Sequence, residues 1–260
     1  MRQVVLLKDI PDLNEVSGLD LEADLRQQVS KTRINELDKR ALEAALRTKE
    51  KNGGEVVVLS LGDDKTKTAI LEALAMGADE AYIVESTQAR RLDSNATSKV
   101  LAAALRKLDP VDLVLCGEMA LDSMNSQLGP RLGVALGIPC ICYVKEYDVE
   151  GGVLTATRDL DQYDEVVEVS LPAVVSVVRE INEPRIPSLM NIMRARKKPQ
   201  TVWSIEELGL EISNLEQQSR VEIQGLERPV TSRKQVKIEA ETIEETVAKL
   251  VEKLREEGVI

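Results

Sequence analysis

The segment Gln3–Lys8 reads QVVLLK, a short and almost wholly apolar run near the start of the chain. Such a run is typical of a central parallel strand that is buried on both faces of a sheet. Three later runs share this character, namely Glu55–Ser60 (EVVVLS), Ala81–Val84 (AYIV) and Asp112–Cys116 (DLVLC). These four runs predict the parallel strands of one sheet.

Segments with helical periodicity separate the runs. We expect helices that start at Asn35, Thr66, Asp93 or Ser94, and Ser126, and that end before Gly53, Gly77, Pro110 and Gly137. Strands that alternate with helices of this length predict an α/β fold with a doubly wound, mostly parallel, Rossmann-like sheet and right-handed crossovers. The connection 9–31 is long, which indicates a functional loop or a small hairpin.

The pattern changes after Cys140. Strands are predicted at Cys140–Val149, Val153–Asp159, Glu165–Val169 and Ala173–Val178, the first two joined by a Gly-Gly hairpin turn. Asn182–Gln200 contains three prolines and a basic cluster, which indicates a loop that leads into a short helix.

The last part of the chain has less apolar content. Capping boxes at Ser204/Glu207 and Thr242/Glu245 predict two helix starts, within Thr201–Leu210 and at Thr242–Glu257. Between them we expect an irregular Glu211–Arg233 and a strand at Gln235–Glu239. The predicted organisation is a core domain (1–180), a loop with a short helix (181–200) and an extension (201–260). The extension has too little apolar content to form its own core, so it must lie either on this chain or on a partner.

Composition excludes several classes of function. The 260 residues include no His, no Phe, one Trp and four Tyr, and the net charge is −11. A negative chain without aromatic platforms disfavours a nucleic-acid partner, and the lack of His excludes a Ser-His-Asp triad and His-ligated metal. The three cysteines, the lack of a leader and the lack of a 20-residue apolar run predict a cytoplasmic protein with no membrane insertion.

The segment Gly117–Gly129 is the candidate ligand loop. It follows a central strand and ends at a helix N-terminus, where ligands bind in open α/β sheets and where a phosphate is favoured. Asp122, Ser126 and Gln127 offer polar groups to a sugar or phosphate. The alternative is an ordinary loop in which Ser126 only caps the helix.

Other candidate sites are weaker. Cys140 and Cys142 would lie on one face of a strand, with Cys116 on another strand, and three thiols do not complete a four-ligand site. We therefore interpret them as core cysteines and expect no metal. No pair of residues forms a convincing nucleophile and base, so we predict no catalytic residue.

The segment Asn182–Pro199 (NEPRIPSLMNIMRARKKP) resembles the signature segment of electron transfer flavoprotein β subunits. Other landmarks of that family occur in order: Val5–Asp12, Asn35–Leu46, Ala73–Asp79 and Cys116–Pro130. The closing part, from Trp203 onward, is similar to the longer members. The resemblance covers essentially the whole chain.

The resemblance implies a heterodimer with an α subunit that carries most of the contacts to FAD. Such a complex passes electrons from acyl-CoA dehydrogenases or other flavoenzymes to a quinone-linked oxidoreductase or another acceptor. The β subunit holds an adenine nucleotide: AMP in the simple type, or a second FAD that accepts electrons from NADH in the electron-bifurcating type.

The resemblance also assigns residues. The nucleotide would contact the following positions: Leu6, Asn35, Asp38, Leu61, Gly62, Cys116, Gly117, Asp122, Ser126, Gln127, Leu128 and Gly129. Leu13 and Leu37 stand where the simple type places aromatic side chains near the flavin. Leu189, with Met190 and Met193 beside it, stands where the family docks a partner dehydrogenase.

The departures from the simple type favour the bifurcating one. Neither Leu13 nor Leu37 is aromatic, and the C-terminal tail is long. The loop Asp122–Pro130 keeps the Asp, Gln, Gly and Pro of the bifurcating pattern, while its middle differs. A third alternative, of another class, is a universal-stress-type homodimer that binds ATP; it leaves Asn182–Pro199 without a role.

Overall fold

The computed structural model describes residues 1–12, 31–88, 92–219, 221 and 234–260. Its contacts divide the chain into two units, Met1–Gln224 and Gly225–Ile260. Each unit is described by itself.

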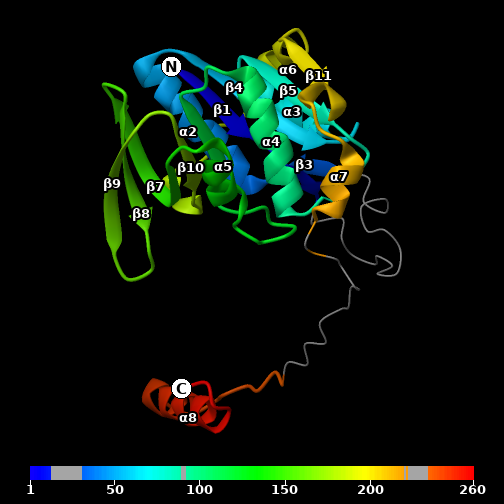
Figure 1. The fold of residues 1–260 in the computed structure, drawn as a ribbon. Coiled ribbons are helices and arrows are strands. Elements are labelled where there is room, and N and C mark those ends of the chain that lie inside the picture. The colour runs from blue at the N-terminus through cyan, green and yellow to red at the C-terminus, as the bar shows by residue number, and fades with distance from the viewer. Residues whose placement is uncertain (13–30, 89–91, 220, 222–233) are drawn as a thin grey trace. The chain divides into compact units, whose positions relative to one another are not determined.

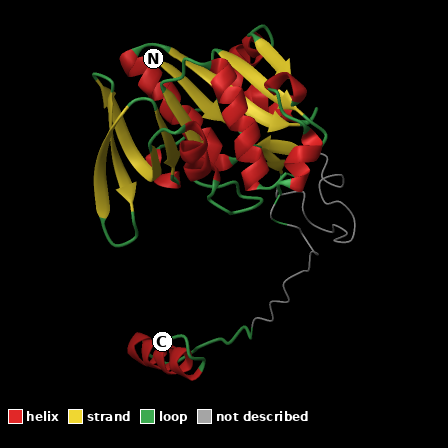
Figure 2. Ribbon diagram, viewed as in Figure 1, coloured by secondary structure: helices red, strands yellow, loops and turns green. Residues whose placement is uncertain are grey.

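The first unit is built on a large sheet that runs through its middle (Figure 2). Within the described residues this sheet has nine strands, in the order β11-β5-β4-β1-β6-β10-β7-β8-β9. Its strands are β1 (Arg2–Leu6), β4 (Glu55–Gly62), β5 (Glu80–Glu85), β6 (Leu113–Gly117), β7 (Cys140–Glu150), β8 (Val153–Asp159), β9 (Asp164–Ser170), β10 (Ala173–Val177) and β11 (Gln200–Trp203). The strands from β11 to β7 pair in parallel, and β8 and β9 continue the sheet as an antiparallel ribbon.

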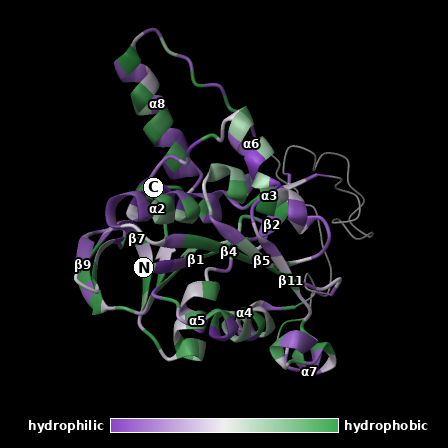
Figure 3. Ribbon diagram, turned by 90° about the horizontal axis from the view of Figure 1, so that it is seen from above, coloured by the Kyte–Doolittle hydropathy of each residue, from purple (hydrophilic) through white to green (hydrophobic). Residues whose placement is uncertain are grey.

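Helices cover both faces of this sheet (Figure 1). The helices of the first unit are α2 (Glu36–Asn52), α3 (Thr66–Met76), α4 (Ser94–Leu108), α5 (Leu128–Leu136), α6 (Leu189–Ala195) and α7 (Ile212–Gln217). Seen from above, α2 and α3 lie on one face and α4 and α5 on the other (Figure 3). Successive side chains of a strand point to opposite faces, so Val5 packs in the core under α2 and α3 while Val4 packs in the core under α4 and α5. The predicted α/β doubly wound fold is confirmed.

The order of the strands places a crossing point beside β1. The chain passes from β1 to β4 and β5 on one side and then returns to β6 on the other side of β1. The carboxyl ends of β1 and β6 therefore flank the topological switch point, where open α/β sheets bind ligands.

The long connection 9–31, predicted to be a functional loop or a small hairpin, has a short antiparallel pair of strands at its ends. β2 (Asp9–Pro11) pairs antiparallel with β3 (Thr32–Ile34) in a small separate sheet. The predicted hairpin is thus present at the two ends of this connection, and residues 13–30 lie outside the described part.

Two predictions for residues 201–233 are wrong: the helix within Thr201–Leu210 and the wholly irregular stretch after it. The Ser204/Glu207 capping box exists, with Ser204 N–H donating to Glu207 Oε2 at 2.7 Å and Glu207 N–H donating to Ser204 Oγ at 3.2 Å. It introduces only a 3₁₀ turn, Glu206–Leu208, because the preceding residues form β11 along the edge of β5 and bury Trp203. The stretch predicted to be irregular contains α7, which buries Leu215.

The second unit contains one described helix, α8 (Ile243–Glu256). Thr242 Oγ1 accepts a hydrogen bond from the N–H of Glu245, which confirms the predicted helix start. The predicted strand at 235–239 is wrong, since the structure has no strand among the described residues 234–242. Ile243, Val247 and Leu250 are exposed along α8. The three-part organisation proposed from the sequence remains a prediction.

Candidate functional site

Asp38 is the buried centre of the switch point. It lies in the first turn of α2, and its two carboxylate oxygens accept hydrogen bonds from the backbone N–H groups of Lys8 and Gly117, both at 2.9 Å. Burial raises the pKa of Asp38 from 3.8 to about 6, and the hydrogen bonds from Lys8, Gly117 and Asn35 oppose that rise. One side chain thus joins the carboxyl ends of β1 and β6.

Asn35 fixes the loop that follows β6. It precedes α2, as predicted, but its side chain does not cap that helix. Its amide Nδ2 donates to the carbonyl of Met119 at 2.9 Å, and its Oδ1 accepts from the N–H of Leu121 at 3.1 Å. Because α2 is packed on the sheet, these two hydrogen bonds position the candidate ligand loop.

The middle of the loop is tied to β1 and then opens outward. Lys8 Nζ lies 2.7 Å from Asp122 Oδ1. Met124 and Ser126 have positive φ angles of 47° and 50°, and the side chain of Asn125 between them is exposed. Helix α5 begins at Leu128, so the predicted start at Ser126 is two residues early, and Ser126 does not act as its cap.

Within the described part of the chain, no side chain caps the N-terminus of α5, where Leu128 and Gly129 carry backbone N–H groups and Pro130 carries none. Gln127 occupies the capping position, but its Oε1 accepts from Arg131 Nε at 3.0 Å instead of capping the helix. The first N–H groups of a helix have no partner within the helix, and the helix dipole favours an anion there. Arg131, one turn into α5, adds a positive charge beside them. This end suits a phosphate.

The end of β4 forms the other side of the site. Gly62 is packed so closely that a Cβ there would lie 1.9 Å from Thr66 Oγ1. Thr66 Oγ1 in turn donates to Asp9 Oδ1 at 2.8 Å, which joins α3 to the connection after β1. Leu61 and Gly62 therefore lie across β1 from the loop, at the same edge of the sheet.

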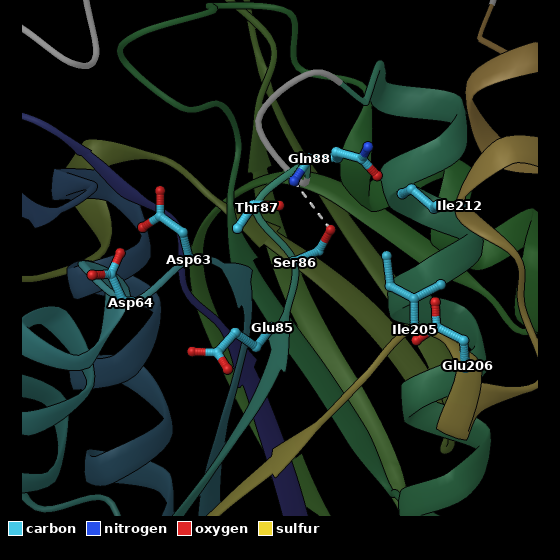
Figure 4. Close-up of a pocket in the computed structure, with 9 residues that line it drawn as sticks. All are labelled: Asp63, Asp64, Glu85, Ser86, Thr87, Gln88, Ile205, Glu206 and Ile212. Atoms are coloured by element: carbon cyan, nitrogen blue, oxygen red, sulfur yellow. Dashed lines mark hydrogen bonds between the residues drawn. The ribbon is translucent and has the colours of Figure 1, made fainter.

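A cavity of about 420 Å³ opens just beyond Leu61 and Gly62. Its lining comes from the ends of β4 and β5 and from the segment after β11: Asp63, Asp64, Glu85, Ser86, Thr87, Gln88, Ile205, Glu206 and Ile212. In Figure 4 the carboxylates of Asp63, Asp64 and Glu85 lie on one side and the apolar Ile205 and Ile212 on the other. Ser86 Oγ accepts from the N–H of Gln88 at 3.2 Å. The acidic lining favours an uncharged, polar ligand group over a phosphate.

The remaining predicted contact residues are mostly interior. Leu6 is buried at the end of β1, and Cys116 is buried beneath α5, where burial raises the pKa of its thiol. Gly129 is buried close to Cys116 Sγ. Leu37 is also buried, since Gly117 leaves room for it: a Cβ on Gly117 would lie 2.5 Å from Leu37 Cβ. Leu13 lies outside the described residues.

The signature segment is anchored on α2. Arg185 Nε lies 2.7 Å from Glu43 Oε2, and its Nη1 lies 2.6 Å from Glu50 Oε1. Asn182 Nδ2 donates to the carbonyl of Arg40 at 3.0 Å. Burial alone would raise the pKa of Glu43, but the hydrogen bonds from Arg185 and Arg47 lower it. The segment and the switch point thus share one rigid helix.

Beyond this anchor the segment presents apolar side chains. Leu189, Met190 and Met193 are 76%, 58% and 68% exposed, whereas Ala195 at the end of α6 is buried against the core. Lys198 Nζ then donates to the carbonyls of Leu74 and Ala78 at the end of α3. An exposed apolar surface on a firmly held short helix is typical of a docking site.

Sequence reasoning missed several residues of the site. Lys8, Asp9 and Thr66 connect its parts, and Ser86–Gln88 line the cavity. Their positions in the sequence could have indicated them, because each of these residues follows a strand that ends at this edge of the sheet. Among the described residues no three His, Cys, Asp or Glu side chains are arranged to hold a metal ion. None of the described helices has the length and hydropathy needed to cross a bilayer.

Comparison with known proteins gives the family. Residues 25–208 match the model of the electron transfer flavoprotein domain. Over the full length of both chains, the protein is 36% identical to an electron transfer flavoprotein subunit beta of Thermoanaerobacterium thermosaccharolyticum and 35% identical to the caffeyl-CoA reductase-Etf complex subunit CarD of Acetobacterium woodii. It is 33% identical to the Megasphaera elsdenii electron transfer flavoprotein subunit beta, over 76% of each chain.

These matches span the switch point and the signature segment alike. They favour the electron-carrier alternatives over the universal-stress-type sensor and confirm the resemblance found in Asn182–Pro199. The chain belongs to the electron transfer flavoprotein β-subunit family.

Proposed function

We propose that this chain holds an adenine nucleotide at the switch point and, with an FAD-carrying α subunit, transfers electrons between a flavoenzyme or NADH and an acceptor. The observation that carries the proposal is the hydrogen-bonded link from Asp38 and Asn35 to the loop after β6. That link holds the open N-terminus of α5 at the edge where such sheets bind nucleotides.

Different residues of the site suit the phosphate and the ribose of the nucleotide. The α5 N-terminus and Arg131 suit the phosphate, and Ser126 and Gln127 offer polar groups to the ribose. Leu6, Cys116 and Gly129 form the interior beneath. Asp122, paired with Lys8, orients the loop, so its role in binding is positional. Bound flavin would supply the electron-transfer chemistry, and the protein residues bind and orient it.

The cavity favours a second FAD over AMP. The ends of β6 and β5 are three strand spacings apart in the sheet, about 14 Å at 4.8 Å each. A mononucleotide held at α5 has no need of a space at the end of β5. A dinucleotide with its phosphates at α5 can extend across β1, and its uncharged ring system suits a cavity lined by carboxylates and by Ile205 and Ile212.

The exposed apolar surfaces account for the protein partners. Leu189, Met190 and Met193 would dock a dehydrogenase of the acyl-CoA type or another flavoenzyme. Of the predicted extension 201–260, the part beyond α7 would pack on the α subunit, since Trp203, Ile205 and Leu215 pack in the core of this chain. Leu13 and Leu37 would stand near the flavin of that subunit. A quinone-linked oxidoreductase is a candidate acceptor, and the cytoplasm is the expected compartment.

The experiment is to co-express the chain with an electron transfer flavoprotein α subunit from the same organism and to count the bound cofactors. After denaturation and separation, two FAD per heterodimer and reduction by NADH support the bifurcating proposal. One FAD with one AMP supports the simple carrier and overturns the second FAD. A colourless homodimer would contradict both.

A further inference from the structure

Two thiols lie together under α5, away from any role in the proposed function. Cys140 Sγ and Cys142 Sγ are 3.6 Å apart on β7. The strand is irregular at this point: between the pairs Val175–Ile141 and Val177–Val144 it holds one residue more than β10 does, and Tyr143 has a φ of 62°. The irregularity accompanies two cysteines that are close together on one strand.

The environment distinguishes the two thiols from Cys116. Cys140 and Cys142 are half-buried, whereas Cys116 is 1% exposed. The Cys140 thiol, the Ser176 hydroxyl and the Arg158 guanidinium lower the pKa of Cys142, while burial raises that of Cys116. Arg158 Nε is held in place by the carbonyl of Cys142 at 2.9 Å and its Nη1 by Glu165 at 2.6 Å. The pKa of Cys140 is raised, chiefly by its contact with Cys142 and by burial. Of the three thiols, Cys142 therefore has the largest thiolate fraction at neutral pH, and it is the one expected to attack first.

We propose that Cys140 and Cys142 are a reversible dithiol site that a small-molecule disulfide oxidises to an intrachain disulfide. The Cys142 thiolate attacks one sulfur of RSSR, forms Cys142–S–S–R and releases RS⁻. Cys140 then attacks Cys142 Sγ, forms the Cys140–Cys142 bond and releases the second RS⁻. The two cysteines lose two electrons and two protons, and RSSR is reduced to two RSH.

Helix α5 would sense this change because it rests directly on the pair. A Cβ on Gly133 would lie 2.7 Å from Cys140 Cβ, and one on Gly129 would lie 3.7 Å from Cys140 Sγ. Closing the sulfurs from 3.6 Å to the bonded distance of about 2.05 Å shifts side chains beneath these glycines. Because the α5 backbone packs closely on Cys140 at Gly129 and Gly133, a movement of the cysteine side chains should also move the helix.

The test uses the heterodimer treated with oxidised glutathione, then alkylated and digested after Arg131 and Lys145. We expect the peptide 132–145 to be two hydrogens lighter and unalkylated, and to regain two alkyl groups after dithiothreitol. The amides of α5 should exchange faster in the oxidised form. Cys116 of the same protein is the internal control, and after denaturation its thiol should be alkylated equally with and without oxidised glutathione.

Single variants test the order of the steps. Cys140→Ser should accumulate a glutathione adduct on Cys142, and Cys142→Ser should react more slowly at Cys140. Full alkylation of wild-type 132–145 after oxidation, or a disulfide that involves Cys116, would overturn the proposal. Unchanged exchange in α5 upon oxidation would overturn the link to that helix. Neither readout depends on which nucleotide is bound.

Discussion

Asp38 Oδ1 lies 2.9 Å from the backbone nitrogen of Gly117, and this hydrogen bond ties the first turn of α2 to the end of β6. The other carboxylate oxygen holds the N–H of Lys8 after β1. The chain thus places a buried carboxylate at its switch point, and each of its oxygens accepts a backbone hydrogen bond. A neutral apolar side chain there would leave two buried donors without a partner.

We expect Asp38→Asn to loosen this point at neutral pH. The amide has one oxygen and presents an NH₂ group to the second backbone N–H, and an unsatisfied buried donor costs about 1–3 kcal/mol. Amide exchange at Lys8 and Gly117 should accelerate, and nucleotide retention should fall by roughly tenfold, as about 1.4 kcal/mol implies. Asp161→Asn, in the exposed turn between β8 and β9, is the control. Equal exchange in the two variants would contradict the role of Asp38.

The raised pKa of Asp38 predicts a particular pH dependence of stability. The folded state binds the proton more tightly than the unfolded state, with a pKa of about 6 against 3.8. The resulting stabilisation is complete below pH 3.8 and is lost as the pH rises through 6. It amounts to about 3 kcal/mol. Urea unfolding of wild type and Asp38→Asn across pH 4–7 measures it, and a constant difference between them would refute the shift.

Gly133 tests the packing of α5 on β7. Its Cβ position lies 2.7 Å from Cys140 Cβ and 3.2 Å from the carbonyl of Ile138, so Gly133→Ala should destabilise the chain by about 1–3 kcal/mol. Val134→Ala, on the same helix but 86% exposed, should change stability by less than about 0.5 kcal/mol. Chemical unfolding at one pH compares the two. Similar stabilities would mean that α5 is packed more loosely than described.

Leu189 tests the docking surface. Leu189→Ala should raise the concentration of partner dehydrogenase needed for half-maximal electron transfer by about tenfold, or ~1.4 kcal/mol, because an exposed apolar anchor is lost. Flavin content should stay normal. Val166→Ala, a similarly exposed residue on β9, is the matched control. The assignment fails when both variants saturate at the same partner concentration as wild type.

The parallel core was predictable because its physical signals are local. Apolar runs such as Glu55–Ser60 and a helix bounded by Thr66 and Met76 are written in consecutive residues. Val4 and Val5, which pack into opposite cores, show why such a run has no polar alternation. The loop Gly117–Gly129 could be located by the same logic, since ligands bind at the carboxyl ends of these strands.

The errors have a different origin. β11 forms because the edge of β5 is open to pairing and because Trp203 is buried beside Tyr82, with 4.7 Å between the ring centres. Neither the open edge nor the burial can be predicted from Thr201–Trp203 alone. The strand predicted at 235–239 finds no such partner among the described residues. The roles of Lys8 and Thr66 depend on which strand ends meet, so they follow from topology and not from a motif.

The measurement that tests the central claim most directly is the number of adenylate groups released from the purified heterodimer, counted as AMP after phosphodiesterase treatment. The count is independent of whether the second nucleotide is FAD or AMP. We predict two adenylate groups per heterodimer, one from each chain. A single adenylate group, with the flavin of the α subunit intact, would show that the switch point beside Asp38 and Gly117 holds no nucleotide.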